Sequence, residues 1–290
     1  MRVLVSGGSG YVGTEVVASL VSAGHEVRAL THRARVGAPA GVEQVAGDVA
    51  DAASYSAAAE GCDAIVHLVA ILDGTDEQFE AINAGGARNA VAAARANGIG
   101  RIVHMSALGV NEQHAALTRY WRTKYAGKTA VTESGLEWTV IEPSFVFGRN
   151  GGALKAFENL IKLPVAPVIG DGRYRHQPVW VGDVATAFVR ALERPETSGQ
   201  AIPLGGPQVF TFDELLDELA RVTGRAPRRK LHVPAGLVKV QTPVLSHLPP
   251  PLKVTKEQIV MLLEGTECDI GPMRTLLGIE PASIAEAYTR

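Results

Sequence analysis

Short apolar runs alternate with segments of helical periodicity over the first half of the chain. The runs, which predict strands, cover residues 2–6, 26–31, 42–46, 64–68, 101–106 and 138–142. Between them, small and apolar residues recur at helical spacing and predict helices over 11–23, 52–60, 77–97 and 120–134. Strands that alternate with helices in this way predict a parallel sheet covered on both faces, which is a doubly wound α/β (Rossmann) fold.

The pattern changes in the second half of the chain. Helices are predicted over 183–192 and 212–222, the second with Thr211 as its N-cap and Glu214 completing a capping box. Prolines and glycines interrupt most of the remainder. We therefore expect a doubly wound (Rossmann) domain over 1–205 and a small, mainly helical C-terminal lobe over 206–290, which also receives parts of 148–176.

Composition narrows the class of protein and of partner. The 290 residues are 46% hydrophobic with a formal net charge of −2, so charge gives no reason to expect nucleic acid or an anionic membrane as partner. No apolar run is long enough to span a bilayer, and a strand at the N-terminus leaves no room for a signal peptide. The two cysteines, Cys62 and Cys268, show no metal-ligand spacing. We expect a cytoplasmic monomer or homodimer that binds a small molecule and no metal.

Three glycines follow the first strand and precede the first helix. Gly7 allows a tight turn, Gly10 removes a Cβ where a pyrophosphate would approach, and Gly13 permits close packing of the helix. The N–H groups and positive dipole end of that helix would face the phosphates. A glycine triplet in a strand–turn–helix context indicates a dinucleotide site.

A tyrosine and a lysine stand four residues apart in the helix predicted over 120–134. Tyr120 and Lys124 therefore lie on one helix face, and Ser106 ends a strand fourteen positions upstream. A phenol acts as acid or base near neutral pH when a cation lowers its pKa, and a serine hydroxyl can bind the same substrate oxygen. The alternative is an ordinary solvated surface pair, since short motifs match often by chance.

Several motifs in the same order resemble those of the short-chain dehydrogenase/reductase superfamily, in its extended and atypical branches. The resemblance extends to the group of the dinucleotide-binding accessory subunit of respiratory complex I and to epimerase-like NAD(P)-binding proteins. The superfamily motifs are Gly7–Gly13, Gly47-Asp48-Val49, His67–Ala70, Asn83 with Asn89, Val103–Ser106, Tyr120–Lys124, Pro143–Gly148 and Val181–Val184. The likeness to the complex I group rests on Ser106–Gly109 and Gly135–Pro143.

The resemblance implies a role for each matching residue. Tyr120 would be the acid/base, Lys124 would hold the nicotinamide ribose and lower the tyrosine pKa, and Ser106 would orient the substrate carbonyl. The cofactor-binding residues would be Gly7, Ser9, Gly10, Tyr11, Val12 and Gly13 at the phosphates, Asp48 and Val49 at the adenine, Val69 and Ala70 at its ribose, and Lys124, Pro143 and Phe145 at the nicotinamide end. Each of three residues also has a structural explanation: Asp48 as the cap of the next helix, Asn83 as a surface residue and Asp183 as an N-cap.

The end of the second strand bears on the choice of dinucleotide. Specificity for NAD usually requires an acidic residue there, and the chain has Thr31, His32, Arg33 and Arg35 instead. The arginines, with His32, could pair a 2′-phosphate through charge-assisted bonds, or they could be solvated loop cations. We favour NADP(H) and keep NAD(H) as the alternative.

Three functions fit these motifs. The first is an NADPH-dependent oxidoreductase that reduces a carbonyl with Tyr120 as the acid/base. The second is a non-catalytic dinucleotide-binding accessory, assembly or redox-sensing protein, because the complex I subunit keeps a similar tyrosine–lysine pair without a known turnover role. The third is an NAD-dependent epimerase or dehydratase, which fits the superfamily but not the sequence Thr31-His32-Arg33.

Overall fold

The structure is a computed structural model that describes residues 1–32, 41–148, 151–234, 236 and 255–289. It divides into two compact units. Unit 1 comprises 1–143, 181–204 and 271–280, and unit 2 comprises 144–180, 205–270 and 281–290. We expected a boundary at 205 with parts of 148–176 added to the second lobe. The chain passes from one unit to the other several times, once between Leu204 and Gly205.

Unit 1 is built on a seven-stranded sheet whose order is β12-β6-β5-β4-β1-β2-β3. Every neighbouring pair in it is parallel, which confirms the doubly wound α/β fold. The order places β1 beside β2 on one side and β4 on the other, so the carboxyl ends of β1 and β4 meet at the crevice where such sheets bind ligands. The strands are β1 (Arg2–Ser6), β2 (Glu26–Thr31), β3 (Val42–Ala46), β4 (Ala64–His67), β5 (Arg101–Met105), β6 (Glu137–Pro143) and β12 (Gln200–Leu204).

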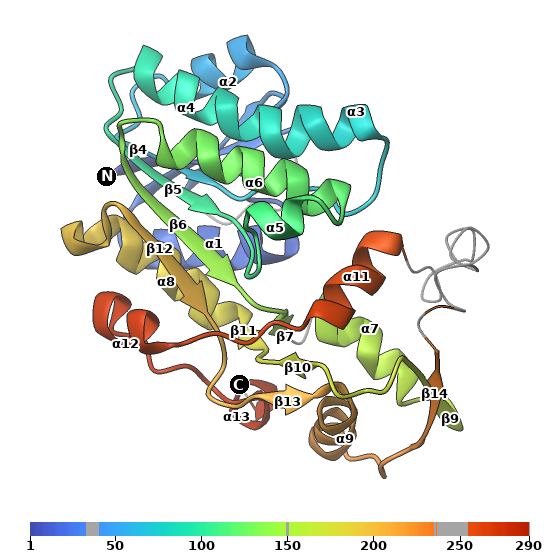
Figure 1. Ribbon diagram of the computed structural model, residues 1–290. Helices are drawn as coiled ribbons and strands as arrows, with labels where there is room; N and C mark the ends of the chain where they lie inside the picture. The colour runs from blue at the N-terminus through green and yellow to red at the C-terminus, as the bar shows by residue number, and fades with distance from the viewer. Residues whose placement is uncertain (33–40, 149–150, 235, 237–254, 290) are drawn as a thin grey trace. The chain divides into compact units, whose positions relative to one another are not determined.

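Helices cover both faces of this sheet (Figure 1). On one face α1 and α8 pack against each other, and on the other α2 packs on α4 and α4 on α6. Apolar strand residues such as Leu4, Ile65 and Ile102 are fully buried between the layers. The helices are α1 (Tyr11–Ser22), α2 (Ala52–Ala59), α3 (Asp76–Phe79), α4 (Gly86–Ala96), α5 (Glu112–Ala115), α6 (Arg119–Thr132), α8 (Val181–Glu193) and α12 (Gly271–Leu277).

The long helix expected over 77–97 is not a single α-helix. A π-helical segment, Glu80–Gly85, separates α3 from α4. The α3 helix begins at a capping box in which Thr75 and Gln78 exchange bonds. Asp183 lies in the first turn of α8, which begins at Val181, so it is not the N-cap.

Unit 2 has short strands and an amphipathic helix, α9 (Phe212–Val222). The predicted capping box of Thr211 and Glu214 is confirmed. Phe147, Leu154 and Phe212 lie in its buried core. Its other elements are β7 (Val146–Gly148), β8 (Gly151–Gly152), α7 (Ala153–Leu160), β9 (Val165–Ile169), β10 (Arg175–His176), β11 (Val179–Trp180), β13 (Phe210–Thr211), β14 (Arg229–Val233), α11 (Lys256–Glu264) and α13 (Ile284–Thr289). In the part of the chain that the structure describes, no helix is long and apolar enough to cross a membrane.

Candidate dinucleotide site and catalytic residues

The glycine loop between β1 and α1 is closely packed on itself. Gly7 has a φ of +82°, and its carbonyl accepts the Gly10 N–H at 3.0 Å. A Cβ on Gly13 would lie 2.0 Å from the Gly7 oxygen, so only glycine fits there. Gly13 thus lets α1 begin directly against the turn, because nothing but backbone separates the two.

The start of α1 is suited to an anion. Its N-cap, Gly10, offers no side chain to the first N–H groups of the helix, and the first turn carries no acidic residue. Among the described residues, a Cβ on Gly10 would meet the Gly7 oxygen alone, at 3.3 Å, so these residues leave the space in front of the turn open. Backbone donors, a positive helix end and an open approach fit the diphosphate of a dinucleotide.

The ends of β4 and β2 border the same loop. Val69 lies against Gly7, since its Cγ2 would be 3.0 Å from a Cβ placed there, and Ala70 is exposed. Thr31 is buried at the end of β2, and its hydroxyl has no hydrogen-bond partner within the described ranges. His32 Nδ1 is 3.7 Å from Asp48 Oδ2. Arg33 and Arg35 lie outside the described residues.

Asp48 and Val49 form the connection between β3 and α2. The Asp48 carboxylate accepts the Ala50 N–H at 2.9 Å, while the N-cap of α2 is Asp51. Val49 is buried and its carbonyl accepts the Asn89 amide at 2.8 Å. Asp48 therefore does not cap the helix. Its side chain shapes the connection locally and remains half exposed beside His32.

Lys124 joins α6 to the end of β5. It is buried, and its ammonium donates to the carbonyl of Met105, the residue before Ser106. Tyr120 precedes Lys124 by one turn of α6 and is also buried. The Ser106 N–H donates to the Ile141 carbonyl at 2.8 Å, and its buried hydroxyl has no partner in the described part of the chain. Lys124 is therefore bonded to the peptide group that joins Met105 and Ser106.

Burial shifts the pKa values of both helix residues. Desolvation raises the pKa of Tyr120 to about 12. Desolvation also lowers the pKa of Lys124 to about 7, against a smaller opposing effect of Glu142. The sequence led us to expect that Lys124 lowers the tyrosine pKa; in the structure the pKa of Tyr120 is raised instead, because burial disfavours the phenolate.

Asn83 has a role that its position in the sequence left open. It lies in the π-helical segment and is 1% exposed, so it is not a surface residue. Its amide oxygen accepts the Ile71 N–H at 2.8 Å, and its amide nitrogen donates to the Ile71 carbonyl and to Thr123 Oγ1, both at 3.2 Å. Asn83 therefore fastens the loop after β4 to α6 beside Lys124.

A row of polar side chains crosses the sheet at its carboxyl end, and sequence reasoning missed it. Ser6, His67 and His104 are register neighbours on β1, β4 and β5, and all are buried. Ser6 Oγ is 2.8 Å from His67 Nδ1, Tyr55 donates to Ser6 Oγ at 2.9 Å, and the two imidazoles stack at 5.4 Å between centroids. The available signal was a histidine at or near the end of two otherwise apolar strands.

The positions predicted at the nicotinamide end fall in different units. Pro143 ends β6 in unit 1, where its carbonyl accepts the Leu108 N–H at 3.0 Å. Phe145 belongs to unit 2 and stacks on His176, with centroids 4.8 Å apart.

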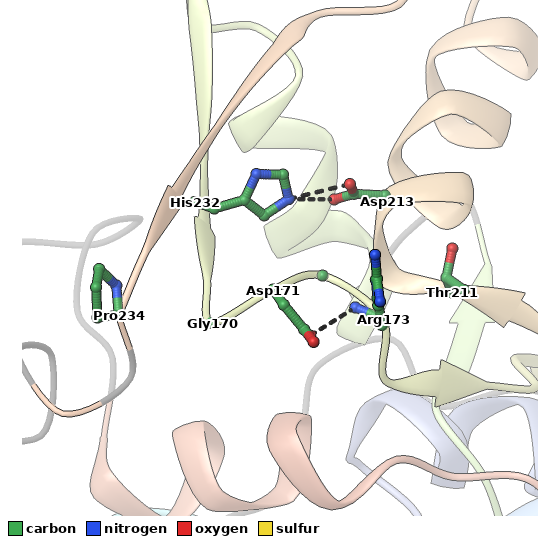
Figure 2. A pocket seen from close by; sticks show the side chains of 8 residues that line it. Gly170, Asp171, Arg173, Thr211, Asp213, His232 and Pro234 are labelled. Atoms are coloured by element: carbon green, nitrogen blue, oxygen red, sulfur yellow. Dashed lines mark hydrogen bonds and ion pairs between the residues drawn. The ribbon is translucent and has the colours of Figure 1, made fainter.

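Unit 2 contains a cavity of about 740 Å³ that none of the predicted site residues lines. In Figure 2 the imidazole of His232 points toward the carboxylate of Asp213, with Nε2 at 3.0 Å from Oδ2. Gly172 also lines the cavity, and a Cβ there would lie 2.4 Å from Asp213. The cavity belongs to the turn between β9 and β10 and is separate from the residues that carry the dehydrogenase-like motifs.

Three relatives illustrate the range of similar proteins. An uncharacterized protein of Mycobacterium tuberculosis is 26% identical over 99% of this chain, and this chain spans 29% of its length. A (4-alkanoyl-5-oxo-2,5-dihydrofuran-3-yl)methyl phosphate reductase of Streptomyces griseus is 32% identical over 86% of this chain and 83% of its own. Subunit 9 of the NADH dehydrogenase 1 alpha subcomplex of Arabidopsis thaliana is 34% identical over 48% of this chain and 35% of its own.

Solved structures share the fold. An epimerase of Methanothermobacter thermautotrophicus matches with a TM-score of 0.77 at 21% identity, over 100% of this chain and 90% of its own. A short-chain dehydrogenase/reductase superfamily protein of Agrobacterium tumefaciens with bound NAD matches with a TM-score of 0.74 at 21% identity, over 99% of this chain and 94% of its own.

A family model described as NAD(P)H-binding matches residues 7–195, from the glycine loop to the end of α8. The matched region includes Tyr120, Lys124 and Ser106. It covers more than half of the chain. The protein therefore belongs to the NAD(P)H-binding family.

Proposed function

We propose that the protein is an NADPH-dependent oxidoreductase that reduces a carbonyl group. The observation that carries this proposal is the hydrogen bond from the Lys124 ammonium to the Met105 carbonyl, the group next to Ser106 in the chain. Tyr120 precedes Lys124 by one turn of the same helix. A relative of 32% identity that is named as a reductase supports the reaction class.

Tyr120, Ser106 and Lys124 each have a different role in the proposed reduction. A bound reduced nicotinamide supplies a hydride to the carbonyl carbon. Tyr120 is protonated at neutral pH because its pKa is raised to about 12, so it holds the proton that the carbonyl oxygen needs. The unpartnered hydroxyl of Ser106 can donate to the same oxygen. Lys124, with a pKa of about 7, supplies positive charge that stabilises the phenolate left behind, and solvent then returns the proton.

Replacing Tyr120 tests this reaction. Tyr120→Phe keeps the buried ring and removes the proton, so we expect carbonyl reduction to fall by at least about 100-fold, the usual contribution of general acid catalysis. Dinucleotide affinity should change less than about threefold, because the phenol is not at the phosphates. Tyr125→Phe, on the same helix and half-buried, is the matched control and should keep full activity.

A non-catalytic dinucleotide-binding role is the second candidate. The burial of Tyr120, only 7% exposed, and the similarity to a complex I subunit favour it. Under that role Tyr120→Phe changes neither dinucleotide binding nor any turnover. A turnover that Tyr120→Phe leaves intact overturns the proposed mechanism.

We propose NADP(H) as the preferred dinucleotide. Support comes from the absence of an acidic residue at Thr31 and His32 and from the cations of His32, Arg33 and Arg35 in the sequence. The Asp48 carboxylate, 3.7 Å from His32, is the group in this region that would instead bind a 2′-hydroxyl. Fluorescence titrations with NADPH and NADH decide between them, and tighter binding of NADH contradicts the proposal. The variant Asp48→Asn should bind NADH more weakly and NADPH more tightly than the unmodified chain.

A further inference from the structure

A carboxylate lies beside Ser106 on the neighbouring strand, and the proposed reaction does not use it. The β5 and β6 strands are parallel, with Met105 opposite Ile141. The Ser106 N–H donates to the Ile141 carbonyl at 2.8 Å, so the next residues, Ser106 and Glu142, stand at the same level of the sheet. Only 14% of the Glu142 side chain is exposed, so little water screens its charge.

Glu142 faces the layer that contains α6. Side chains alternate between the two faces of a strand, so Glu142 shares a face with Val140, two residues earlier. Val140 is fully buried in one core cluster with Val131, a residue of α6. Lys128 of the same helix has its Nζ 2.8 Å from Glu142 Oε1. The same Nζ donates to the Val110 carbonyl at 3.3 Å, and the carboxylate is thus fixed against α6.

Lys124 occupies the same face of α6, one helical turn before Lys128. Its ammonium is buried, and its bond to the Met105 carbonyl uses a donor without neutralising the charge. Two cations one turn apart therefore share one carboxylate. Lys128 pairs with Glu142 directly, and the charge of Glu142 also acts on Lys124. A buried ammonium that lacks an anion loses its proton readily, because burial disfavours the charged form.

Glu142 differs in burial from the other acids on the elements that pack against α6. His67 and His104, next along the sheet, are neutral at pH 7, because desolvation and a smaller effect of Lys124 lower the pKa of both. Tyr120, one turn before Lys124, is protonated because its pKa is raised to about 12. The other acids on the described elements that contact α6 are exposed; they are Asp76, Glu77, Glu80, Glu112 and Glu137.

The cations and the remaining histidine on these elements have partners of their own. Arg88 pairs with an acid of the π-helical segment at 2.6 Å, and Arg95 and Arg101 donate to backbone carbonyls at 2.6 and 2.7 Å. His114 stacks on a tryptophan of α6, with ring centroids 4.8 Å apart. Within the described ranges, the charge on Lys124 therefore depends chiefly on one carboxylate.

The balance between burial and this carboxylate is close. Desolvation lowers the pKa of Lys124 to about 7, and Glu142 acts against it. Desolvation in turn raises the pKa of Glu142, while Lys128 and Lys124 lower it. Lys124 is thus near the midpoint of its titration at neutral pH, where the loss of one neighbouring charge changes its protonation most.

We propose that Glu142 is a positioning residue whose carboxylate, fixed by Lys128, keeps Lys124 in the ammonium form at neutral pH. This inference rests on the proposed function, in which that ammonium stabilises the Tyr120 phenolate. Activity is then lost as the pH rises and Lys124 gives up its proton. Without the carboxylate this loss occurs at lower pH.

NMR of the full chain labelled with 13C at lysine Cε follows the proton on Lys124 without any turnover. The Lys124 signal is identified by its absence in Lys124→Met. We expect its midpoint near pH 7 in the unmodified chain and at about pH 6 or below in Glu142→Gln, because an opposite charge at close range changes a pKa by about one or more. Glu137→Gln, at an exposed carboxylate of the same strand, is the matched control and should leave the midpoint unchanged.

A purely structural role of Glu142 gives the opposite result. If its loss only loosened α6, water would reach Lys124, relieve the desolvation and raise the midpoint toward 10.5. A midpoint that is raised or unchanged in Glu142→Gln overturns the proposal. Should that variant fail to fold, Glu142→Gln combined with Lys128→Gln leaves no unpaired cation and must show the same fall.

Reduction of phenanthrenequinone by NADPH measures the consequence for the proposed reaction. From a midpoint lowered by about one, we expect kcat/KM of Glu142→Gln to be about tenfold below that of the unmodified chain at pH 8 and within about twofold of it at pH 5.5. A lowered Lys124 midpoint in a chain that reduces no carbonyl supports the role of Glu142 and counts only against the proposed function. Reduction that requires Tyr120, with an unmoved Lys124 midpoint in Glu142→Gln, overturns the role of Glu142 and leaves the proposed function standing.

Discussion

At the scale of single residues, the three glycines of the first loop have separable tasks. Gly7 supplies a positive φ, Gly13 makes room for backbone, and Gly10 leaves space that the protein itself does not fill. The spacing of the three glycines predicted that they form a dinucleotide-binding loop. The contacts of an added Cβ then distinguish a glycine that packs against backbone from one that leaves room for a ligand.

Gly10→Ala and Gly13→Ala should therefore differ in effect. A methyl on Gly10 meets one oxygen at 3.3 Å and projects into the open approach, so we expect weaker dinucleotide binding by at least about tenfold with little loss of stability. A methyl on Gly13 would lie 2.0 Å from the Gly7 oxygen, so the free energy of unfolding should fall by about 1–3 kcal/mol as well.

Fluorescence titration and urea unfolding measure the two quantities separately. Gly100→Ala is the control, since a Cβ there meets nothing within 4 Å. Equal destabilisation by the variants at 10 and 13 would contradict the division of tasks.

At the scale of elements, strands and most helices could be predicted from periodicity, whereas their side-chain connections could not. The bounds of β1, β2, β3 and α9 agree with the prediction, because each has a strong apolar pattern between turn residues or a cap. The π-helical segment was missed since its residues also suit an α-helix. The fastening of Ile71 by Asn83 was missed because the contact joins segments whose approach depends on the folded sheet.

Removing the Asn83 side chain should weaken this connection. Asn83→Ala leaves the Ile71 N–H and carbonyl without their partner, so we expect the free energy of unfolding to fall by about 1–3 kcal/mol. Urea unfolding followed by circular dichroism measures the change. Asn159→Ala, which removes one exposed bond to Lys162, should cost less than about 0.5 kcal/mol. A similar loss in both variants would show that the loop is held by other contacts.

At the scale of the whole molecule, the buried histidines link stability to pH. Desolvation, with a smaller effect of Lys124, lowers the pKa of His67 from 6.5 to about 3, and the pKa of His104 is lowered as well. Between these values the unfolded chain binds protons that the folded chain does not. The free energy of unfolding should therefore rise with pH from about 3 to 6.5, by up to about 1.4 kcal/mol per pH unit for each histidine.

His104→Phe tests this link because it keeps an aromatic ring against His67 and removes one titrating group. We would measure the free energy of unfolding by urea between pH 4.5 and 7.5. Its slope against pH should correspond to about one fewer proton taken up on unfolding than in the unmodified chain. The same slope in His104→Phe as in the unmodified chain would rule out His104 as the group responsible.

The repeated passage of the chain between the two units has a consequence for synthesis on the ribosome. The β6 strand is complete at residue 143, but its partner β12 is made only at 200–204, and 271–280 complete unit 1 later still. Until then β6 presents an unpaired edge that can recruit strands of other chains. We therefore expect the nascent chain to be most prone to aggregation between the synthesis of residue 143 and that of residue 204.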